Sequence, residues 1–312
     1  MSNSSPPPTP PSGSVGENRF KCILGPYGES IEEYRPGGYH PVHHHDRFKN
    51  DRYEVIRKLG VGAFSTVWLA IDHMDADMKP EVNDKCVYVF CEILTINHSS
   101  AVRYVALKIE MAKLPKPSRE VIILQHLLKA PEVDAAHVTR LLDLFDHEGP
   151  NGVHSCLVLE PMGTSVSEIA EHIPRPNPWW PAYYPMRMTK RILKDVLKGL
   201  TFLHENQVVH GDLNCANMLL TLKSAQIPNE EISQYINFQW GLISDPVERI
   251  EGKIDRWSPR HLTMTRPLTG YTNTSETCSV KLSDFGGGVY NFQLIYVKAN
   301  SNIKSILRFG SS

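Results

Sequence analysis

The pattern of hydrophobic and polar positions predicts strands in the first half of the chain and helices in the second. Strand-like patterns cover residues 53–59, 66–70, 104–110 and 154–159. Apolar residues spaced three and four positions apart instead predict helices over residues 119–129 and 186–205. Each helix has an apolar stripe that we expect to be buried. The stripes consist of Val121, Leu124, Leu127 and Leu128 in the first helix, and of Ile192, Val196, Leu197, Leu200 and Leu203 in the second.

Two stretches interrupt this order of elements. Residues 72–103 separate two predicted strands, and residues 222–278 are polar with scattered proline and tryptophan. Unpatterned stretches of this length are uncommon inside a compact domain, so we interpret both as insertions looped out of the core. Residues 1–16 are mostly serine, proline, glycine and threonine, which bury too little apolar surface to offset the entropy of ordering, and predict disorder.

Composition narrows the class of protein. The 312 residues leave room for a two-lobed domain, and the 41% hydrophobic and 21% charged fractions are typical of soluble globular proteins. A net charge of −1 without a basic block argues against direct nucleic-acid binding. The six cysteines have neither CxxC nor zinc-ligand spacing, which favours reduced thiols in the cytoplasm or nucleus. We expect no signal peptide and no membrane helix, because no suitable apolar run occurs.

The first motif with chemical meaning is the turn Gly60-Val61-Gly62 between two predicted strands. Glycines at such a turn let the backbone approach phosphate groups closely. The same Gly-x-Gly spacing also occurs in ordinary hairpin turns, so the motif alone leaves both interpretations open.

The second motif is a lysine, Lys108, within the apolar strand Val105-Ala106-Leu107-Lys108. A buried ammonium needs an anionic partner, because its desolvation is otherwise costly. Glu120, twelve residues later in a predicted helix, is the natural partner. An edge-strand lysine that points to water is the alternative.

Two further motifs contain acidic and amide side chains. Asp212 and Asn217 lie five residues apart after the long helix, where they could hold a substrate hydroxyl and a metal ion, although Asp and Asn are also common turn residues. Asp284 directly follows the short apolar strand 280–282, from which it could reach a Mg²⁺ ion that bridges phosphates. A lone Asp-Phe-Gly is also common by chance.

The order of the motifs decides among these alternatives. Glycine turn, strand lysine, helix glutamate, His-x-Asp loop with its asparagine, and Asp-Phe-Gly occur in the order of the phosphoryl-transfer template. The chain therefore resembles the eukaryotic protein kinases. Gly37-Gly38-Tyr39-His40-Pro41-Val42 and Phe64-Ser65-Thr66-Val67-Trp68 narrow the resemblance to the SR-protein kinases, serine/threonine kinases that act on Arg/Ser-rich proteins. Fungal members with a His-Gly-Asp loop are the most similar subgroup.

The resemblance implies an α+β, two-lobed kinase fold, with a β-rich N-lobe over residues 37–162 and a partial helical C-lobe over residues 163–288. Residues 1–36 would be an irregular tail, and residues 289–312 match nothing in the family, as in a truncated or misread gene. It also implies ATP and Mg²⁺ as cofactors, Arg/Ser-rich proteins as substrates, and a link to the regulation of mRNA splicing.

The resemblance assigns a role to each motif residue. Lys108, locked by Glu120, would bind the α- and β-phosphates under the glycine loop, and Asp212 would orient or deprotonate the substrate hydroxyl. Asn217 and Asp284 would hold Mg²⁺. The remaining nucleotide contacts would come from Leu59, Gly60, Gly62, Val67, Ala106, Leu219 and the hinge Glu160 to Met162, with Leu159 at its gate.

The chain departs from the family pattern at three points that bear on its activity or regulation. Gly211 replaces the arginine that usually pairs with an activation-loop phosphate, which suits a kinase not switched on by phosphorylation. Asn214 replaces a lysine that neutralises the transferring phosphate, and losing such a donor can cost roughly 10²–10³ in rate. No Ala-Pro-Glu-like motif follows Gly286, so apolar helix faces of the large lobe should lie uncovered and solubility should be poor. The alternative function is therefore a catalytically impaired, pseudokinase-like interaction module or a non-functional fragment.

Three remaining features have structural interpretations. His43-His44-His45 cannot all face one ion, so we do not expect a metal site there. Trp179-Trp180 is interpreted as the anchor of a loop. Cys215, beside the predicted catalytic loop, could be a reactive thiol, but we interpret it as a small buried side chain.

Overall fold

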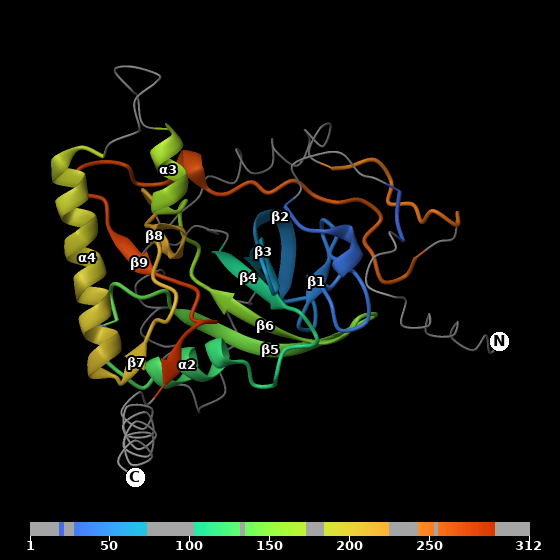
Figure 1. Cartoon of the computed structure of the whole chain (residues 1–312), viewed down its shortest axis with the longest axis horizontal. Helices are drawn as coiled ribbons and strands as arrows, with labels where there is room; N and C mark the ends of the chain where they lie inside the picture. Colours follow the sequence, from blue (N-terminus) through green and yellow to red (C-terminus); the bar gives the residue numbers. More distant parts are fainter. Residues whose placement is uncertain are drawn as a thin grey trace, which may run out of the picture.

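The computed structural model describes residues 19–21, 28–73, 103–131, 135–172, 184–224, 243–252 and 255–290. The predicted disorder of residues 1–16, most of the first insertion, Trp179-Trp180 and nearly all of the predicted C-terminal tail lie outside these residues. Figure 1 shows a twisted sheet beside a long helix, α4 (Met186–Glu205), with the shorter helix α2 (Arg119–Leu127) below the sheet.

A six-stranded antiparallel sheet forms the first half of the fold. Its order is β1-β2-β3-β4-β6-β5. The strands are β1 (Arg47–Phe48), β2 (Tyr53–Gly62), β3 (Ser65–Asp72), β4 (Arg103–Glu110), β5 (Leu141–Gly149) and β6 (Gly152–Leu159). All four strands expected from the apolar pattern are confirmed, whereas β1 and β5 had no clear signal. One face of the sheet is closed by an apolar cluster that includes Trp68, Leu107 and Val158.

Helix α2 places one predicted site residue against the sheet. It begins after Ser118, whose hydroxyl accepts the Val121 N–H at 3.2 Å, a typical N-cap. Val121, Leu124 and Leu127 are buried as predicted, and Glu120 is buried with them. Leu128 is only half-buried.

The second half contains helices and short strands. They are α3 (Val166–His172), α4, β7 (Val208–Val209), the 3₁₀ turn η2 (Cys215–Asn217), β8 (Met218–Leu220), β9 (Val280–Leu282) and β10 (Val289–Tyr290). Strand β8 pairs with β9 and β7 pairs with β10, both antiparallel. The 3₁₀ turns η1 (Ile31–Glu33) and η3 (Thr269–Tyr271) complete the described elements.

The packed face of α4 differs in one position from the prediction. Ile192, Val196 and Leu203 are buried and Leu200 is half-buried, but Leu197 is 63% exposed, so its predicted burial is wrong. The helix approaches the rest of the protein at Gly199, where an added Cβ would lie 2.8 Å from the His137 carbonyl oxygen. This close approach turns Leu197 to the opposite side.

The described parts of the second insertion pack against the core, so the expectation that they loop out of it is wrong. Leu262, Leu268 and Thr272 are almost completely buried. Figure 1 shows the orange trace of residues 255–278 running across the top of the sheet, and part of it reaches the N-terminal segment at the far side. The few apolar residues scattered through this polar stretch are enough to dock it.

Candidate active site

Three charged residues from distant parts of the chain meet at Lys108. The lysine lies on β4 opposite Val67 of β3 and is 8% exposed. Its Nζ donates to Glu120 Oε2 of α2 at 2.5 Å and to Asp284 Oδ1 at 3.1 Å. The predicted partnership of Lys108 with Glu120 is therefore formed, and Asp284, just after β9, joins it.

The electrostatics of this cluster favour the charged forms. Burial alone would lower the pKa of Lys108, but the carboxylates of Glu120 and Asp284 outweigh burial and raise it. Burial would likewise raise the pKa of Asp284, but the Lys108 ammonium holds it below its usual value. Near pH 7 the site thus presents the Lys108 ammonium beside the ionised Asp284 side chain.

The loop after β7 holds Asp212 by two amide side chains. Asn217 Nδ2 donates to Asp212 Oδ2 at 3.1 Å and to its carbonyl oxygen at 2.9 Å. Asn214 Nδ2 donates to Asp212 Oδ1 at 3.1 Å. Asn214 also caps η2, because its Oδ1 accepts the Ala216 N–H at 2.8 Å and the Asn217 N–H at 3.2 Å. Sequence reasoning noticed only the lysine that Asn214 replaces and missed this clamp.

Strand pairing brings the Asp212 loop beside Asp284. The Asn217 carbonyl oxygen accepts the Ser283 N–H at 2.9 Å, which continues the β8–β9 ladder to the residue before Asp284. His210 Nε2 lies 3.0 Å from the Ser283 carbonyl oxygen, and its ring lies 5.2 Å from that of the buried Phe285. Asp284 has a φ of 62°, an uncommon conformation for a residue with a side chain, and such strain is found at functional sites.

Asn217 and Asp284 fit a Mg²⁺ ion. The Asn217 amide nitrogen is turned to Asp212, which leaves the amide oxygen for a metal, and the ionised Asp284 side chain is 50% exposed. Mg²⁺ in nucleotide sites is typically held by one or two protein oxygens together with phosphates and water. Within the described ranges, no group of three or more His, Cys, Asp and Glu side chains could hold a metal ion.

The glycine turn has space that the protein itself does not use. An added Cβ on Gly60 would meet no atom within 4 Å among the described residues. Internal packing among the described residues therefore does not require glycine there, and the open space would let a phosphate approach the backbone closely. Gly60 pairs with Val67 and Gly62 pairs with Ser65 at the end of the β2–β3 hairpin.

The residues expected to contact adenine come from both halves of the fold. Ala106 of β4 pairs with Leu159 of β6. Val67 of β3 pairs with Lys108, which lies two residues after Ala106 on β4. Leu219 lies on β8 in the other half of the fold. Glu160 follows β6, and its carboxylate is occupied by Lys281 Nζ at 2.7 Å and by the Arg140 N–H at 2.9 Å. A base at the hinge would therefore meet the main chain of residues 160–162.

Thr272 of the insertion contacts the segment after the hinge, and no sequence pattern predicted this contact. Thr272 Oγ1 accepts the Thr164 N–H at 2.9 Å and donates to the Leu268 carbonyl oxygen at 2.9 Å. The insertion is thus attached to the segment that follows the hinge.

The backbone at Gly211 shows why the chain departs from the family pattern there. Gly211 has a φ of 77°, and an added Cβ would lie 2.0 Å from the Gly287 carbonyl oxygen, so only glycine fits this arrangement. Cys215 is exposed, so its predicted burial is wrong.

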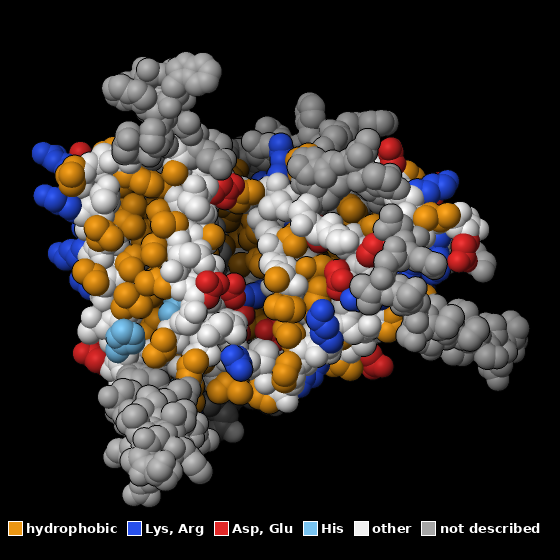
Figure 2. Space-filling view, viewed as in Figure 1, with side chains coloured by type: hydrophobic (Ala, Val, Ile, Leu, Met, Phe, Trp, Pro, Cys, Tyr) orange, Lys and Arg blue, Asp and Glu red, His pale blue; other side chains and the backbone are white. Residues whose placement is uncertain are grey.

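In Figure 2 a furrow separates the α4 side from the sheet side, and acidic and basic side chains face one another across it. No helix among the described residues is long and apolar enough to cross a membrane.

Comparison with known proteins agrees with this geometry. The protein kinase domain family matches residues 89–228. The serine/threonine-protein kinase SKY1 of Saccharomyces cerevisiae is 31% identical over 203 residues, which are 62% of this chain and 23% of that protein. Protein kinase dsk1 of Schizosaccharomyces pombe is 32% identical over 250 residues, 78% of this chain and 37% of that protein. Human SRSF protein kinase 3 is 34% identical over 211 residues, 64% of this chain and 30% of that protein.

The chain spans between 23% and 37% of the length of these relatives. One solved kinase domain aligns with 79% of this chain and 55% of its own, with 20% identity and a TM-score of 0.43. The expected fold, a β-rich first lobe followed by a partial helical lobe, is confirmed. The chain matches the protein kinase domain family over residues 89–228, and it is similar to serine/threonine kinases that include SKY1, dsk1 and SRSF protein kinase 3.

Proposed function

We propose that the chain is an ATP-dependent serine/threonine protein kinase that phosphorylates Arg/Ser-rich proteins and thereby regulates mRNA splicing. One observation carries the proposal: Lys108 contacts Glu120 and Asp284 at the same time. The contact joins the sheet, α2 and the Asp-Phe-Gly segment in the arrangement that phosphoryl transfer needs. The same resemblance implies that the chain acts in the cytoplasm, the nucleus or both.

Each residue would contribute by positioning and charge. Lys108, oriented by Glu120, would hold the nucleotide phosphates under Gly60 and Gly62. Asn217 and Asp284 would hold Mg²⁺, which neutralises charge on the phosphates when bound. Asp212, clamped by amide groups, would orient the substrate hydroxyl and accept its proton. Little covalent work is required of the protein, because positioning and electrostatic stabilisation dominate this chemistry.

The choice of substrate follows from the relatives. SRSF protein kinase 3 of human, pig and mouse is 33–34% identical to this chain over its aligned residues. The sequence Phe64-Ser65-Thr66-Val67-Trp68 supports the same family.

One observation favours a second candidate function, a pseudokinase-like interaction module. Asn214 stands where kinases place a lysine that neutralises the transferring phosphate, and its amide is bonded to Asp212 instead. Such a site could bind nucleotide and turn over slowly, because the fold and the nucleotide residues do not depend on that lysine.

Phosphate transfer distinguishes the two candidates. We would incubate the 312-residue chain with Mg-ATP and an Arg-Ser repeat peptide, beside the matched variant Lys108→Met. We expect incorporation by the wild type and its loss in the variant, since the phosphates lose their anchor.

A peptide with alanine in place of every serine controls for non-specific incorporation. Folded wild-type protein that transfers no more phosphate than Lys108→Met would exclude an enzyme. In that case nucleotide binding without turnover would support the interaction module.

A further inference from the structure

Two chain segments outside the β2–β3 hairpin support the glycine loop from its outer side. It consists of two segments, residues 19–39 of the N-terminal segment and residues 243–268 of the insertion, in their described parts. We call them together the outer brace. Both segments lie next to β2, the strand that leads into the glycine loop.

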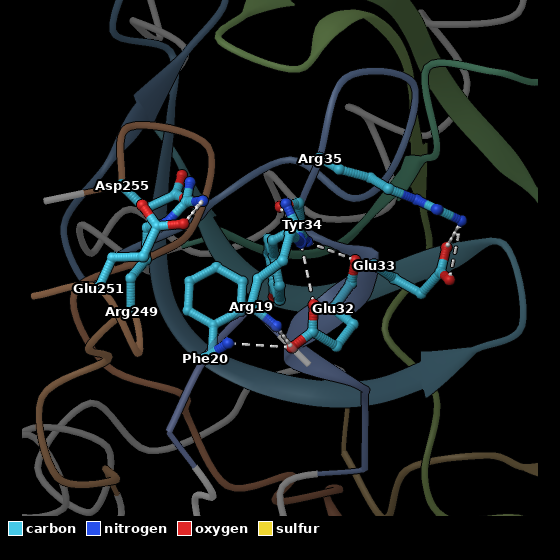
Figure 3. Close-up of polar contacts among 9 residues, drawn as sticks. All are labelled: Arg19, Phe20, Glu32, Glu33, Tyr34, Arg35, Arg249, Glu251 and Asp255. Carbon is cyan, nitrogen blue, oxygen red and sulfur yellow. Dashed lines mark hydrogen bonds and ion pairs between the residues drawn. The ribbon is translucent and has the colours of Figure 1, made fainter. Parts of the chain in front are cut away.

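The two segments of the brace are joined to each other. Phe20 and Arg249 form an antiparallel bridge, flanked by hydrogen bonds from the Lys21 N–H to the Glu248 carbonyl at 2.9 Å and from the Ile250 N–H to the Arg19 carbonyl at 3.0 Å. Figure 3 shows the Arg19 side chain and the Phe20 main-chain N–H bonded to the Glu32 carboxylate, with Arg249 and Asp255 of the insertion beside them. The brace is therefore one unit, although its halves lie more than 200 residues apart.

The brace is fixed to β2 by a buried charge. Lys58, at the middle of β2, is 0% exposed, and its ammonium forms an ion pair with the equally buried Glu29 of the N-terminal segment. The same ammonium donates to the Thr263 carbonyl oxygen of the insertion at 3.3 Å. The Arg266 N–H donates to the Lys58 carbonyl oxygen at 2.9 Å. One lysine thus attaches both segments two residues before Gly60.

Tyr39 carries this support to the tip of the loop. Its Oη donates to the Gly62 carbonyl oxygen at 2.8 Å, with the Ala63 carbonyl oxygen at 3.4 Å. The Tyr39 side chain is 5% exposed, whereas Gly62 and Ala63 are exposed. Burial, together with Glu29 and Glu33, raises the pKa of Tyr39, so its hydroxyl keeps the proton that it donates.

We propose that Tyr39 is a positioning residue that holds the Gly62 peptide from outside the glycine loop and so sets the affinity for the nucleotide phosphates. The proposal rests on the proposed function, since it assumes that this loop covers a nucleotide. A glycine-rich hairpin tip loses conformational freedom when phosphates bind to it. A hydroxyl that already fixes the peptide reduces that loss.

A merely structural role predicts a different result. Tyr39 also belongs to an apolar cluster with Tyr34, Met111 and Leu262, where its ring could serve packing alone. Tyr39→Phe keeps the ring and removes the hydroxyl, so it separates the two roles. Tyr53→Phe is the matched control, because the Tyr53 hydroxyl lies at the far end of β2, where it donates to Asp143 Oδ2 at 2.6 Å.

The first measurement is titration of the full chain and both variants with the ATP analogue AMP-PNP and Mg²⁺. Loss of one hydrogen bond corresponds to roughly a two- to tenfold change in an equilibrium constant. We expect Kd to rise by about this factor in Tyr39→Phe and to stay unchanged in Tyr53→Phe. In phosphate transfer the KM for ATP should rise similarly, while kcat and the KM for the peptide do not change. An unchanged Kd in Tyr39→Phe, or an equal rise in Tyr53→Phe, overturns the proposal.

The second measurement does not depend on nucleotide binding. Amide hydrogen exchange of residues 59–66 in the nucleotide-free chain should be faster in Tyr39→Phe than in the wild type, with no difference in Tyr53→Phe. Equal exchange in Tyr39→Phe and the wild type overturns the proposal. If the wild type binds no nucleotide, the proposed function fails, and this exchange still decides whether Tyr39 holds the loop.

Discussion

The contacts of Asp284 show how single side chains connect the two halves of this protein. The residue adopts a left-handed backbone conformation at the end of β9, and its carboxylate reaches the Lys108 ammonium on β4. The Gly286 N–H also donates to this carboxylate. An unfavourable backbone conformation is thus offset by two interactions of the charged side chain.

This arrangement predicts that the stability contributed by Asp284 depends on pH. Because Lys108 lowers the folded-state pKa of Asp284 below its ordinary value of 3.8, the contribution is fully present above pH 4. It is lost as the pH falls through the lowered folded-state pKa. Asp284→Asn should therefore be less stable than the wild type in urea unfolding at pH 7, and the difference should shrink as the pH falls below 4.

The control for this prediction is a carboxylate that Lys108 does not contact. Asp146 is exposed and pairs with Lys116. Asp146→Asn should change stability little at either pH. A difference between wild type and Asp284→Asn that stays constant down to pH 3 would contradict the assignment.

A second residue-scale prediction concerns Asn214, whose amide has two separable roles. Asn214→Asp keeps an oxygen to cap η2 but removes the donor to Asp212 and adds a negative charge beside it. A hydrogen bond to a charged group contributes about 1.5–3 kcal/mol, so we expect kcat to fall by roughly tenfold or more. Loss of this bond should also lower thermal stability in either variant. Asn214→Ala, which also loses the cap, should cost about 1 kcal/mol in addition. Equal stabilities of the Asp and Ala variants would show that the cap is unimportant.

At the scale of elements, the sequence predicts the strands and helices that have a regular apolar pattern, and the ion pairs of charged residues within apolar segments. Lys108 and Glu120 were found because charged residues within apolar elements need partners, and the structure pairs them at 2.5 Å. Strand β5 was not predicted, because the register shift between Leu141 and Asp143 breaks the alternation. Tyr39 and Thr272 act through contacts with distant segments, which no local pattern encodes.

The close packing of α4 at Gly199, which leaves Leu197 exposed, can be tested by substitution. Alanine favours helix over glycine by about 1 kcal/mol, yet an added Cβ on Gly199 would lie 2.8 Å from a backbone oxygen of residue 137. Crowding of a packed backbone costs typically 1–3 kcal/mol, so we expect Gly199→Ala to be destabilising in urea unfolding. Lys198→Ala, one position away and exposed, should be neutral. A Gly199→Ala variant more stable than the wild type would show that the helix can shift.

At the scale of the whole molecule, one face of α4 is unusually apolar for an exposed surface. Met186, Leu193 and Leu197 are 56–68% exposed along the helix. Figure 2 shows orange side chains gathered along this side of the molecule, bordered by lysine and arginine. Contiguous apolar surface of this kind favours association.

We therefore predict that the chain self-associates through this stripe. The double variant Leu193→Glu/Leu197→Glu should lower the concentration-dependent light scattering of the wild type, because each glutamate replaces an apolar contact and lies among basic neighbours. Lys194→Glu is a matched control, since both changes alter the formal net charge from −1 to −3. Association by apolar burial should persist at 1 M salt, where charge effects are screened within about 3 Å. If Lys194→Glu lowers the scattering equally, net charge controls association and the apolar stripe does not.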